Sequence, residues 1–350
     1  MNSLSLRALL GRDGGGVCLI AEAGVNHDGE VDKALRLVDA SQAAGADAVK
    51  FQTWRPGECT GRFAYKVDYL KATSPQDESR YQLSQRLCLP YEAFRRISRH
   101  CREVGMPFLS TPDGFQSLDF LVDELDIPLV KVSSTELTHL AFLEAVGRKG
   151  RPVLLSTGMG NLGEIEAALA ALRAHGDPGV TLLHCTSAYP APIEEINLRA
   201  MVTMGRAFQT PVGLSDHSQG LEAAIASVAL GAAVIEKHFT LDKDAPGPDH
   251  RASLDPDEFA ALARSVRRTE LLLGDGLKRM TATEARNAGG IRRGVVAARP
   301  LAKGSVLAEG MLACKRPGSG LPPAFLGLVL GMRVNRDLAE DEPLKWEDLR

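Results

Sequence analysis

Residues 211–238 read PVGLSDHSQGLEAAIASVALGAAVIEKH, and this stretch decides the class of fold. A short apolar run over 212–214 precedes a helical pattern over 221–230, and a second apolar run covers 233–238. Strand, helix and strand in that order form the repeating unit of a parallel sheet. The stretch therefore predicts one βαβ unit in which polar residues follow each strand.

The same alternation runs through most of the chain. Helical patterns at 31–44, 91–104, 115–125 and 164–175 separate further apolar runs. With the unit above, the runs predict eight strands, at 18–23, 48–52, 107–110, 129–132, 153–156, 181–184, 212–214 and 233–238. Eight units favour an α/β fold of the (β/α)8 TIM-barrel type. A doubly wound open sheet is the alternative, but the first turn, residues 24–29, reads GVNHDG and lacks the G-x-G-x-x-G of that fold.

The chain is expected to contain two domains. Residues 1–273 should form the barrel, 274–290 a polar and glycine-rich linker, and 291–350 a small, mostly β domain. The strings RPLA at 299–302 and RDLA at 336–339 suggest two similar halves in the small domain. With about sixty residues it has little core of its own, so it should pack against another surface.

The longest connection within the barrel is residues 53–90, which follow the second strand. An ordinary βα loop has only a few residues. We expect this insertion to fold over the mouth of the barrel, where the active sites of such barrels lie.

Composition excludes several classes of function. The 350 residues carry a net charge of −3, which offers no general attraction to nucleic acid. No apolar run approaches the ~20 residues of a membrane span, and the apolar patch at 4–10 does not lead to a signal-peptide cleavage site. The six cysteines form no C-x-x-C pair. A soluble cytoplasmic protein without nucleic-acid or membrane partners is expected.

Two lysines lie inside apolar strands. Lys50 occurs in AVKFQ and Lys131 in LVKV. A buried ammonium group needs an anionic partner. Each lysine therefore pairs either with a structural carboxylate, such as Glu22 or Glu236, or with a bound anion. Two lysines at similar strand depth favour the anionic ligand.

Hydroxyl groups follow the same strands. Thr111, Ser134, Ser156 and Ser215 come after the third, fourth, fifth and seventh strands. Beside two lysines, hydroxyls and free amides would form a cradle for phosphate and carboxylate groups. The alternative for Ser134 and Ser156 is a helix N-cap.

Two histidines end neighbouring strands. His217 follows the seventh strand and His238 ends the eighth. Two imidazoles there can share one divalent metal and leave positions open for water and substrate. His27 and His184 also lie near strand ends, which leaves a third ligand open. Acidic residues at the same end, Glu22, Glu136 and Asp249, are candidates for binding sugar hydroxyls or moving protons.

These motifs, in this order and spacing, resemble the sialic acid synthase family. The strings that carry the resemblance are AEAGVNHDG at 21–29, VKFQT at 49–53, LSTP at 109–112, LSTGM at 155–159, HCTSAYP at 184–190, GLSDHS at 213–218 and EKHFT at 236–240. The C-terminal strings AKG at 302–304 and KRPGSG at 315–320 resemble the antifreeze-like (SAF) domain of the same synthases. The similarity covers nearly the whole chain.

The resemblance implies a metal-dependent condensation of phosphoenolpyruvate with an amino sugar aldehyde. It implies that phosphoenolpyruvate is held by Lys50, Thr111, Lys131, Ser134, Ser156 and Ser215, with Ser187 beside the phosphate. It implies Mn²⁺ or Mg²⁺ on His217 and His238, and the sugar on Glu22, Glu136, Tyr189 and Asp249. Arg316 would come from the partner subunit of a domain-swapped homodimer. C3 of phosphoenolpyruvate would attack the aldehyde, water would add at C2, and phosphate would leave by C–O cleavage.

The sequence departs from the family pattern around the phosphate. Ser187 replaces the usual asparagine, and Ser133 and Thr135 flank Ser134 where glycine is usual. Residues 247–253, GPDHRAS, resemble neuraminic and legionaminic synthases more than pseudaminic ones. The competing interpretations are another phosphoenolpyruvate-dependent 2-keto-3-deoxy sugar acid synthase and a non-catalytic carbohydrate-binding protein.

Overall fold

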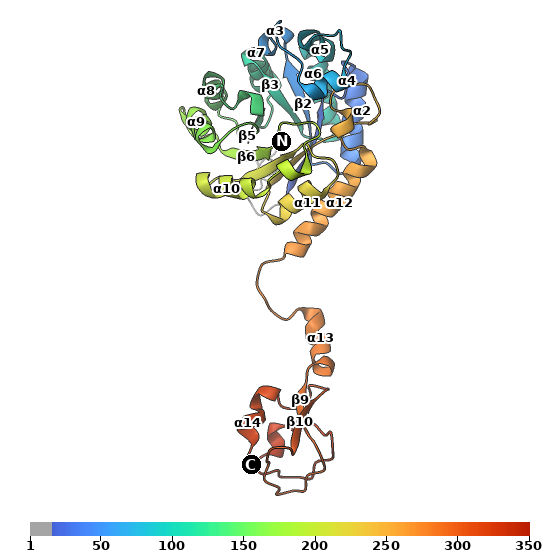
Figure 1. Cartoon of the computed structure of the whole chain (residues 1–350), viewed down its shortest axis with the longest axis vertical. Coiled ribbons are helices and arrows are strands. Elements are labelled where there is room, and N and C mark those ends of the chain that lie inside the picture. Colours follow the sequence, from blue (N-terminus) through green and yellow to red (C-terminus); the bar gives the residue numbers. More distant parts are fainter. Residues whose placement is uncertain (1–15) are drawn as a thin grey trace. The chain divides into compact units, whose positions relative to one another are not determined.

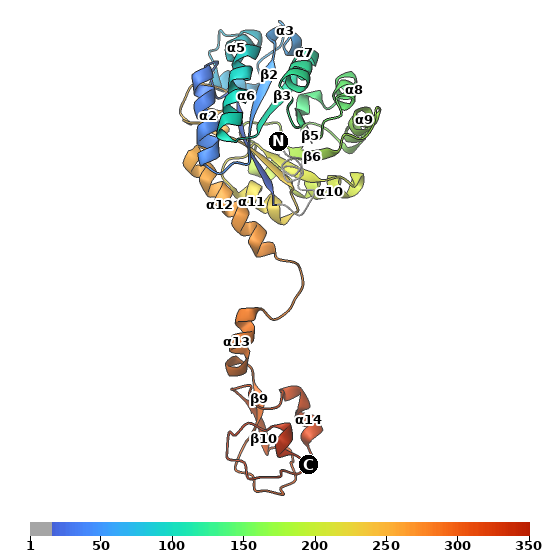
Figure 2. The same ribbon diagram turned by 180° about the vertical axis from the view of Figure 1, so that it is seen from behind.

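The computed structural model describes residues 16–350 of the chain, so the apolar patch at 4–10 lies outside the described residues. The chain divides into two compact units, the first ending at Gly274 and the second covering Asp275–Arg350. Both are drawn in Figures 1 and 2, and each is described by itself below. No helix within residues 16–350 is long and apolar enough to cross a membrane.

The first unit is the predicted (β/α)8 barrel. Its parallel strands are β1 (Cys18–Gly24), β2 (Ala48–Trp54), β3 (Phe108–Asp113), β4 (Val130–Val132), β5 (Val153–Ser156), β6 (Val180–Cys185), β7 (Val212–Asp216) and β8 (Val234–His238). The hydrogen-bonded order is β3-β2-β1-β8-β7-β6-β5-β4, and β3 and β4 lie next to each other where the sheet closes. Several strands extend past the predicted carboxyl ends, where polar residues continue the ladder.

Helices surround the strands (Figure 1). They are α2 (Val31–Ala43), α6 (Tyr91–Val104), α7 (Phe115–Asp119), α8 (Leu140–Arg148), α9 (Leu162–Arg173), α10 (Arg199–Phe208), α11 (Glu222–Ala229) and α12 (Pro256–Leu273). The pattern predicted as one helix at 115–125 is α7 followed by a π-helical turn, Phe120–Glu124. Each helix turns an apolar face to the sheet, as α6 does with Phe94 and Ile97.

The insertion after β2 forms three short helices. They are α3 (Pro56–Cys59), α4 (Asp68–Thr73) and α5 (Arg80–Leu87). Leu70 of α4 and Leu83 of α5 join a small apolar cluster with Trp54 at the end of β2. The insertion is thereby anchored at the carboxyl end of the barrel, as expected. Single 3₁₀ turns follow other strands, at Ser134–Glu136, Ile193–Glu195 and His250–Ala252.

The inside of the barrel is built in layers. Because alternate residues of a strand point to opposite faces, one set of strand residues packs under the helices and the other lines the interior. The interior set forms its own apolar cluster of Cys18, Ile20, Ala48, Leu109, Leu129, Leu154, Leu183 and Val234. Two residues further along the same strands come Glu22, Lys50, Thr111, Lys131, Ser156, Cys185 and Glu236. An apolar plug therefore supports a polar layer directly above it.

The second unit begins with a helix. Helix α13 (Ala282–Ile291) lies in the segment expected to be a linker, and a capping box between Thr281 and Glu284 begins it. The rest is a two-stranded antiparallel sheet of β9 (Gly294–Ala297) and β10 (Leu312–Lys315), a short helix α14 (Leu326–Val329), and 3₁₀ turns at Pro323–Phe325 and Trp346–Asp348. The position of the domain boundary at 291 stays a prediction.

The two halves of the second unit form matched hydrogen bonds. The Leu301 N–H donates to the Leu338 carbonyl (2.8 Å), and the Leu338 N–H donates to the Leu301 carbonyl (2.9 Å). A second pair of bonds repeats this symmetry. The Gly304 N–H donates to the Val334 carbonyl (2.7 Å), and at the matching positions of the other half the Asp341 N–H donates to the Ala297 carbonyl (2.8 Å). The repeated RPLA and RDLA strings thus mark an approximate internal two-fold.

Candidate active site

A cluster of four opposite charges forms the centre of the polar layer. Lys50 Nζ lies 2.6 Å from Glu22 Oε2, and Lys131 Nζ lies 3.1 Å from Glu236 Oε1. Glu236 Oε2 is 3.8 Å from Lys50 Nζ, so both lysines face this carboxylate. All four side chains are at most 5% exposed. The pairing of lysines with structural carboxylates, one of the two alternatives left open above, is therefore present.

The two carboxylates differ in acidity. Burial alone would raise the pKa of Glu236, but Lys131 and Lys50 outweigh it and lower the pKa to about 2. Burial raises the pKa of Glu22 to about 6, with Lys50 acting in the opposite direction and Glu236 adding to the rise. Glu236 thus remains charged, whereas Glu22 exchanges a proton near neutral pH. A carboxyl with that pKa is suited to general acid–base work.

Hydroxyls surround the charged cluster. Thr111 Oγ1 accepts from Lys50 Nζ (3.0 Å), and Ser215 Oγ donates to Glu236 Oε1 (3.0 Å). Ser156 Oγ is buried and has no hydrogen-bond partner among the described residues. Buried polar atoms without partners are rare in proteins and mark places where a ligand or water belongs.

The serines after β4 and β6 converge on Gly158. Ser134 Oγ accepts from the Gly158 N–H (2.9 Å). A Cβ on Gly158 would lie 2.3 Å from Ser187 Oγ and 2.8 Å from Ser134 Oγ, so a side chain there would displace both hydroxyls. Neither Ser134 nor Ser156 is a helix N-cap, because Ser133 and Asn161 occupy those positions. The N-cap interpretation was wrong, and an anion-binding role stays open for both.

His217 and His238 lie together above the charged layer. Their ring centroids are 5.3 Å apart. The His217 Nδ1–H donates to the Thr186 carbonyl (2.8 Å), which leaves Nε2 free to bind a ligand. His238 Nδ1 is buried without a hydrogen-bond partner and lies 3.8 Å from Asp249 Oδ2. Burial lowers the pKa of His238 well below its usual value, so this imidazole is neutral.

This arrangement fits a divalent metal with two protein ligands. Neutral imidazole nitrogens are good ligands, and two of them leave positions for water and substrate. Burial lowers the pKa of His217 but Cys185 outweighs it and raises the pKa, so a metal there would displace a proton from this imidazole. Residues 16–350 contain no group of three or more histidine, cysteine, aspartate or glutamate side chains arranged to hold a metal. His184 Nε2 bonds to the Ile196 carbonyl (2.6 Å), and His27 Nδ1 accepts from the Gly29 N–H (3.0 Å). Neither supplies the third ligand that the sequence left open.

Tyr189 links the histidines to the insertion. Its ring centroid is 4.1 Å from that of His217 and 5.0 Å from that of Tyr69 on α4. A cavity of about 120 Å³ lies beside these rings. Its lining combines residues from the strand ends with residues from the insertion, among them Gln52, Thr60, Tyr69, Arg80, Asp113, Tyr189 and Asp249. The insertion therefore forms one wall of the site.

Asp249 is positioned by a buried network that the sequence did not indicate. The loop after β8 is held by His250, whose Nδ1 is 2.7 Å from Thr240 Oγ1 and whose Nε2 is 3.0 Å from Asp28 Oδ1. Asn26 Nδ2 donates to Ser253 Oγ, and Ser253 Oγ donates to the Asp249 carbonyl. The segment after β1 thereby fixes the loop that carries Asp249. The polar string GVNHDG was the available signal.

Two predicted site residues lie apart from the cluster. Glu136 is on the turn after β4, where its Oε2 is 2.6 Å from His139 Nδ1. His139, which stands just before α8, is thus its partner. Arg316 lies in the second unit, where its side chain is exposed.

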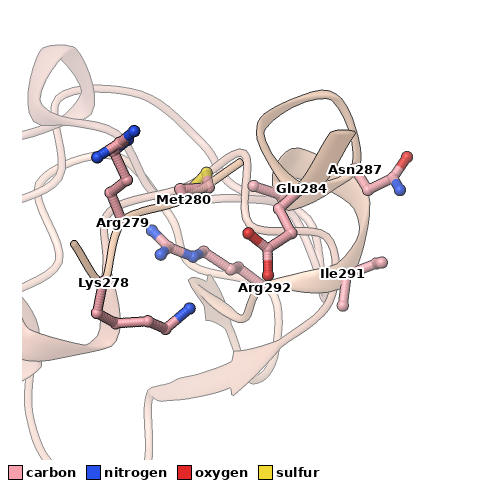
Figure 3. A pocket seen from close by; sticks show the side chains of 8 residues that line it. Lys278, Arg279, Met280, Glu284, Asn287, Ile291 and Arg292 are labelled. Carbon is pink, nitrogen blue, oxygen red and sulfur yellow. The ribbon is translucent and has the colours of Figure 1, made fainter. Parts of the chain in front are cut away.

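The second unit has a cavity of its own (Figure 3). It is lined by Lys278, Arg279, Met280, Glu284, Asn287, Ala288, Ile291 and Arg292. This lining includes no histidine, cysteine, serine or aromatic residue. The groups suited to acid–base or metal chemistry are those at the barrel mouth.

The chain is similar to proteins named as sugar acid synthases. Residues 37–278 match the NeuB family and residues 292–350 match the SAF domain. The chain is 41% identical over 329 residues to N,N'-diacetyllegionaminic acid synthase of Campylobacter jejuni subsp. jejuni, covering 93% of this chain and 98% of that protein. It is 38% identical to the enzyme of the same name from Legionella pneumophila subsp. pneumophila, covering 95% and 94%. The crystal structure of N-acetylneuraminic acid synthetase from Leptospira borgpetersenii is similar with a TM-score of 0.70 and 32% identity, covering 78% and 90%.

The buried charges give a prediction about stability. Glu236→Gln removes the charge that compensates two buried lysines, so the barrel should lose roughly 3–5 kcal/mol of unfolding free energy. Guanidinium denaturation followed by Trp54 fluorescence in a Trp346→Phe background would measure it. Asp68→Asn, which breaks an exposed ion pair with Lys71, is the control and should cause no measurable change. Equal stability of the Glu236→Gln variant and the parent would contradict the proposed role of this charge.

Proposed function

The chain belongs to the NeuB family and carries a SAF domain, and from this premise and the barrel-mouth geometry we propose that it condenses phosphoenolpyruvate with an N-acylated hexosamine. The products are a nonulosonic acid of the N-acetylneuraminate or legionaminate type, and phosphate. The observation that carries the proposal is the pair of buried lysines set directly below two neighbouring imidazoles in one barrel interior. Cations for one substrate and metal ligands for the other are thus adjacent.

Phosphoenolpyruvate would bind in the polar layer. Lys50 and Lys131 supply the positive charge, and Thr111, Ser156 and Ser215 supply hydroxyls. The phosphate would extend to the cradle of Ser134 and Ser187 around the Gly158 amide. The unpartnered Ser156 Oγ supports this placement, since a bound oxyanion would satisfy it.

The amino sugar would bind above this layer. A manganese or magnesium ion held by His217 and His238 would supply Lewis-acid polarisation of the aldehyde oxygen. Tyr189, Asp249 and Glu136 would bind the sugar hydroxyls and its N-acyl group, and Arg316 from a partner subunit would complete the site. Asp249 is suited to this role because its loop is fixed by His250.

Glu22 is the residue proposed to take part in proton transfer during the reaction. C3 of phosphoenolpyruvate forms a bond to the aldehyde carbon, and the aldehyde oxygen becomes a hydroxyl. Water adds at C2, and the C2–O bond to phosphate breaks, giving the 2-keto acid. Glu22, with its pKa of about 6, would take the proton from the attacking water, while Lys50 and Lys131 stabilise the departing phosphate.

The acceptor is proposed to be of the neuraminate or legionaminate class. The string GPDHRAS at 247–253 favours it over the pseudaminate class, and two relatives are named as N,N'-diacetyllegionaminic acid synthases. The acceptor would then be N-acetylmannosamine or a 2,4-diacetamido-trideoxyhexose.

Product formation tests the proposal. Incubation with phosphoenolpyruvate, Mn²⁺ and a panel of N-acylated hexosamines should yield a sugar acid of the condensation mass and one phosphate per product. Lys131→Met should lower kcat/KM for phosphoenolpyruvate by about 100-fold or more, because it removes a buried cation from the substrate. Lys149→Met, at an ion pair on the outside of the barrel, is the matched control. Unchanged kinetics of Lys131→Met would refute the phosphate-binding role.

Metal removal gives a second test. Excess EDTA should lower the condensation rate by at least about 100-fold, because the aldehyde loses its polarising ion. Mn²⁺ or Mg²⁺ should restore the rate, and circular dichroism should report an unchanged fold. Full activity in excess EDTA would reject a metal on His217 and His238.

Mixed dimers test the role of Arg316. Arg316→Ala and His217→Ala should each be inactive alone. If Arg316 acts in the partner's barrel, random re-formation of dimers from both variants should recover about a quarter of wild-type activity, since half of the dimers contain one intact site. Re-formed heterodimers without activity would reject the arrangement between subunits, and an active Arg316→Ala would reject the role itself.

A further inference from the structure

A second pair of buried charges lies on the outer face of the strands that carry the two imidazoles. Lys237 Nζ is 2.8 Å from Asp216 Oδ2, and both side chains are fully buried. Lys237 stands between Glu236 and His238 on β8. Because successive side chains of a strand point to opposite faces, it points away from the barrel interior. The proposed function assigns no role to this pair.

Packing alone gives no reason for two charges at these positions. Ile235, which faces the same way two residues earlier on β8, belongs to the apolar core under the helices. Taking two ions out of water costs about as much as their attraction returns, so apolar residues of similar volume often replace a buried ion pair without loss of stability. The reason for the charges must therefore lie in the groups that they bind.

The hydrogen bonds of this pair enclose His217. Asp216 Oδ1 accepts from the Ser218 N–H (2.9 Å) and from Ser218 Oγ (2.6 Å). Lys237 Nζ donates to the Ser218 carbonyl (2.5 Å) as well as to Asp216 Oδ2 (2.8 Å). One ammonium group on β8 therefore binds both residues that flank His217.

His217 needs such a restraint because it lies just beyond the end of its strand. Both β7 and its ladder with β8 end one residue earlier. The His217 carbonyl accepts from the Ala191 N–H (2.9 Å), and its ring N–H donates to the Thr186 carbonyl (2.8 Å). Both of these contacts come from the connection after β6. Lys237 adds the anchor from β8, the strand on which the next residue is His238.

We infer that Asp216 and Lys237 are positioning residues, which hold His217 in place relative to His238 so that the two imidazoles can share one metal ion. They act through the turn at 216–218, because their own side chains lie on the opposite face of the strands. Residues that orient metal ligands commonly change metal affinity by about 10- to 100-fold. This inference rests on the proposed function and extends its metal site to a pair of residues outside the barrel interior.

The affinity of the metal-free protein for Mn²⁺ tests it. The double variant Asp216→Asn/Lys237→Met breaks the anchor and leaves no unpaired buried charge. Its Kd for Mn²⁺, measured from the electron paramagnetic resonance signal of free Mn²⁺, should be about 10- to 100-fold higher than that of the wild type. The Kd for phosphoenolpyruvate, measured by calorimetry without metal, should not change, because the buried lysines keep their partners.

Thr53→Val/Ser110→Ala is the matched control. It removes another fully buried pair of polar side chains, 2.8 Å apart, from two neighbouring strands that carry no proposed metal ligand. It should keep the wild-type Kd for Mn²⁺. The Mn²⁺ site in question is the one that His217→Ala removes.

The outcomes separate the inference from the proposed function. A double variant that is folded by circular dichroism and keeps the wild-type Kd for Mn²⁺ would overturn the inference alone, as would an equal loss of affinity for phosphoenolpyruvate or in the control. A wild type without a Mn²⁺ site that depends on His217 would refute the proposed metal, and the inference with it. If the double variant does not fold, Ser218→Ala decides, since it removes only the hydroxyl that donates to Asp216. Its Kd for Mn²⁺ should rise about threefold or more, and an unchanged value would overturn the inference.

Discussion

The buried ionic layer is the constraint on which the rest of the barrel depends. Lys50, Lys131, Glu22 and Glu236 lie in the interior at nearly complete burial, and within residues 16–350 they form their ion pairs with one another. Such clusters gain little stability over apolar packing of the same volume, because desolvation offsets the attraction. Their positions therefore need the rigid register of neighbouring strands, in which Glu22 of β1 is aligned with Lys50 of β2 on one side and His238 of β8 on the other. A closed barrel supplies both neighbours at once.

Much of this could be predicted because strand periodicity is two. Ala48 and Leu129 were assigned to buried strands. Lys50 follows Ala48 by two residues and Lys131 follows Leu129 by two, so each lysine had to point to the same face as the apolar residue before it. The pairing with Glu236 was one of two alternatives, and the sequence could not decide for it, since it joins Lys131 of β4 to a residue of β8 that lies 105 positions away. The partner of Glu136 is His139, which stands just before α8, and no pattern in the sequence indicated this contact. The periodicity of a strand decides to which face of the sheet a side chain points. Its partner in an ion pair or hydrogen bond depends on which elements the tertiary structure brings together.

The polar network behind Asp249 shows the same limit. Asn26, Asp28 and His250 carry no catalytic pattern in sequence, and their contacts span more than 200 positions of the chain. Helix α13 was missed for a different reason. Its glycines and polar residues are typical of a linker, and the capping box at Thr281 begins the helix despite them. A capping box and a hydrogen-bond network each involve only a few residues, so neither changes the average composition of a segment.

The residues proposed to act in the reaction and the residues of the insertion lie on different elements. The groups proposed to act on phosphoenolpyruvate lie on strands, where a shifted side chain would disturb the compensated charges around Glu236. Tyr69 and Arg80 lie instead on the insertion, which is anchored by its own apolar cluster at Leu70 and Leu83. A substitution on α5 can therefore change the wall of the cavity beside Tyr189 without altering any ion pair of the buried ionic layer. Loops and insertions carried by a rigid barrel are free to vary in this way. The strand residues proposed to bind phosphoenolpyruvate are thus held by other contacts than the residues of the insertion.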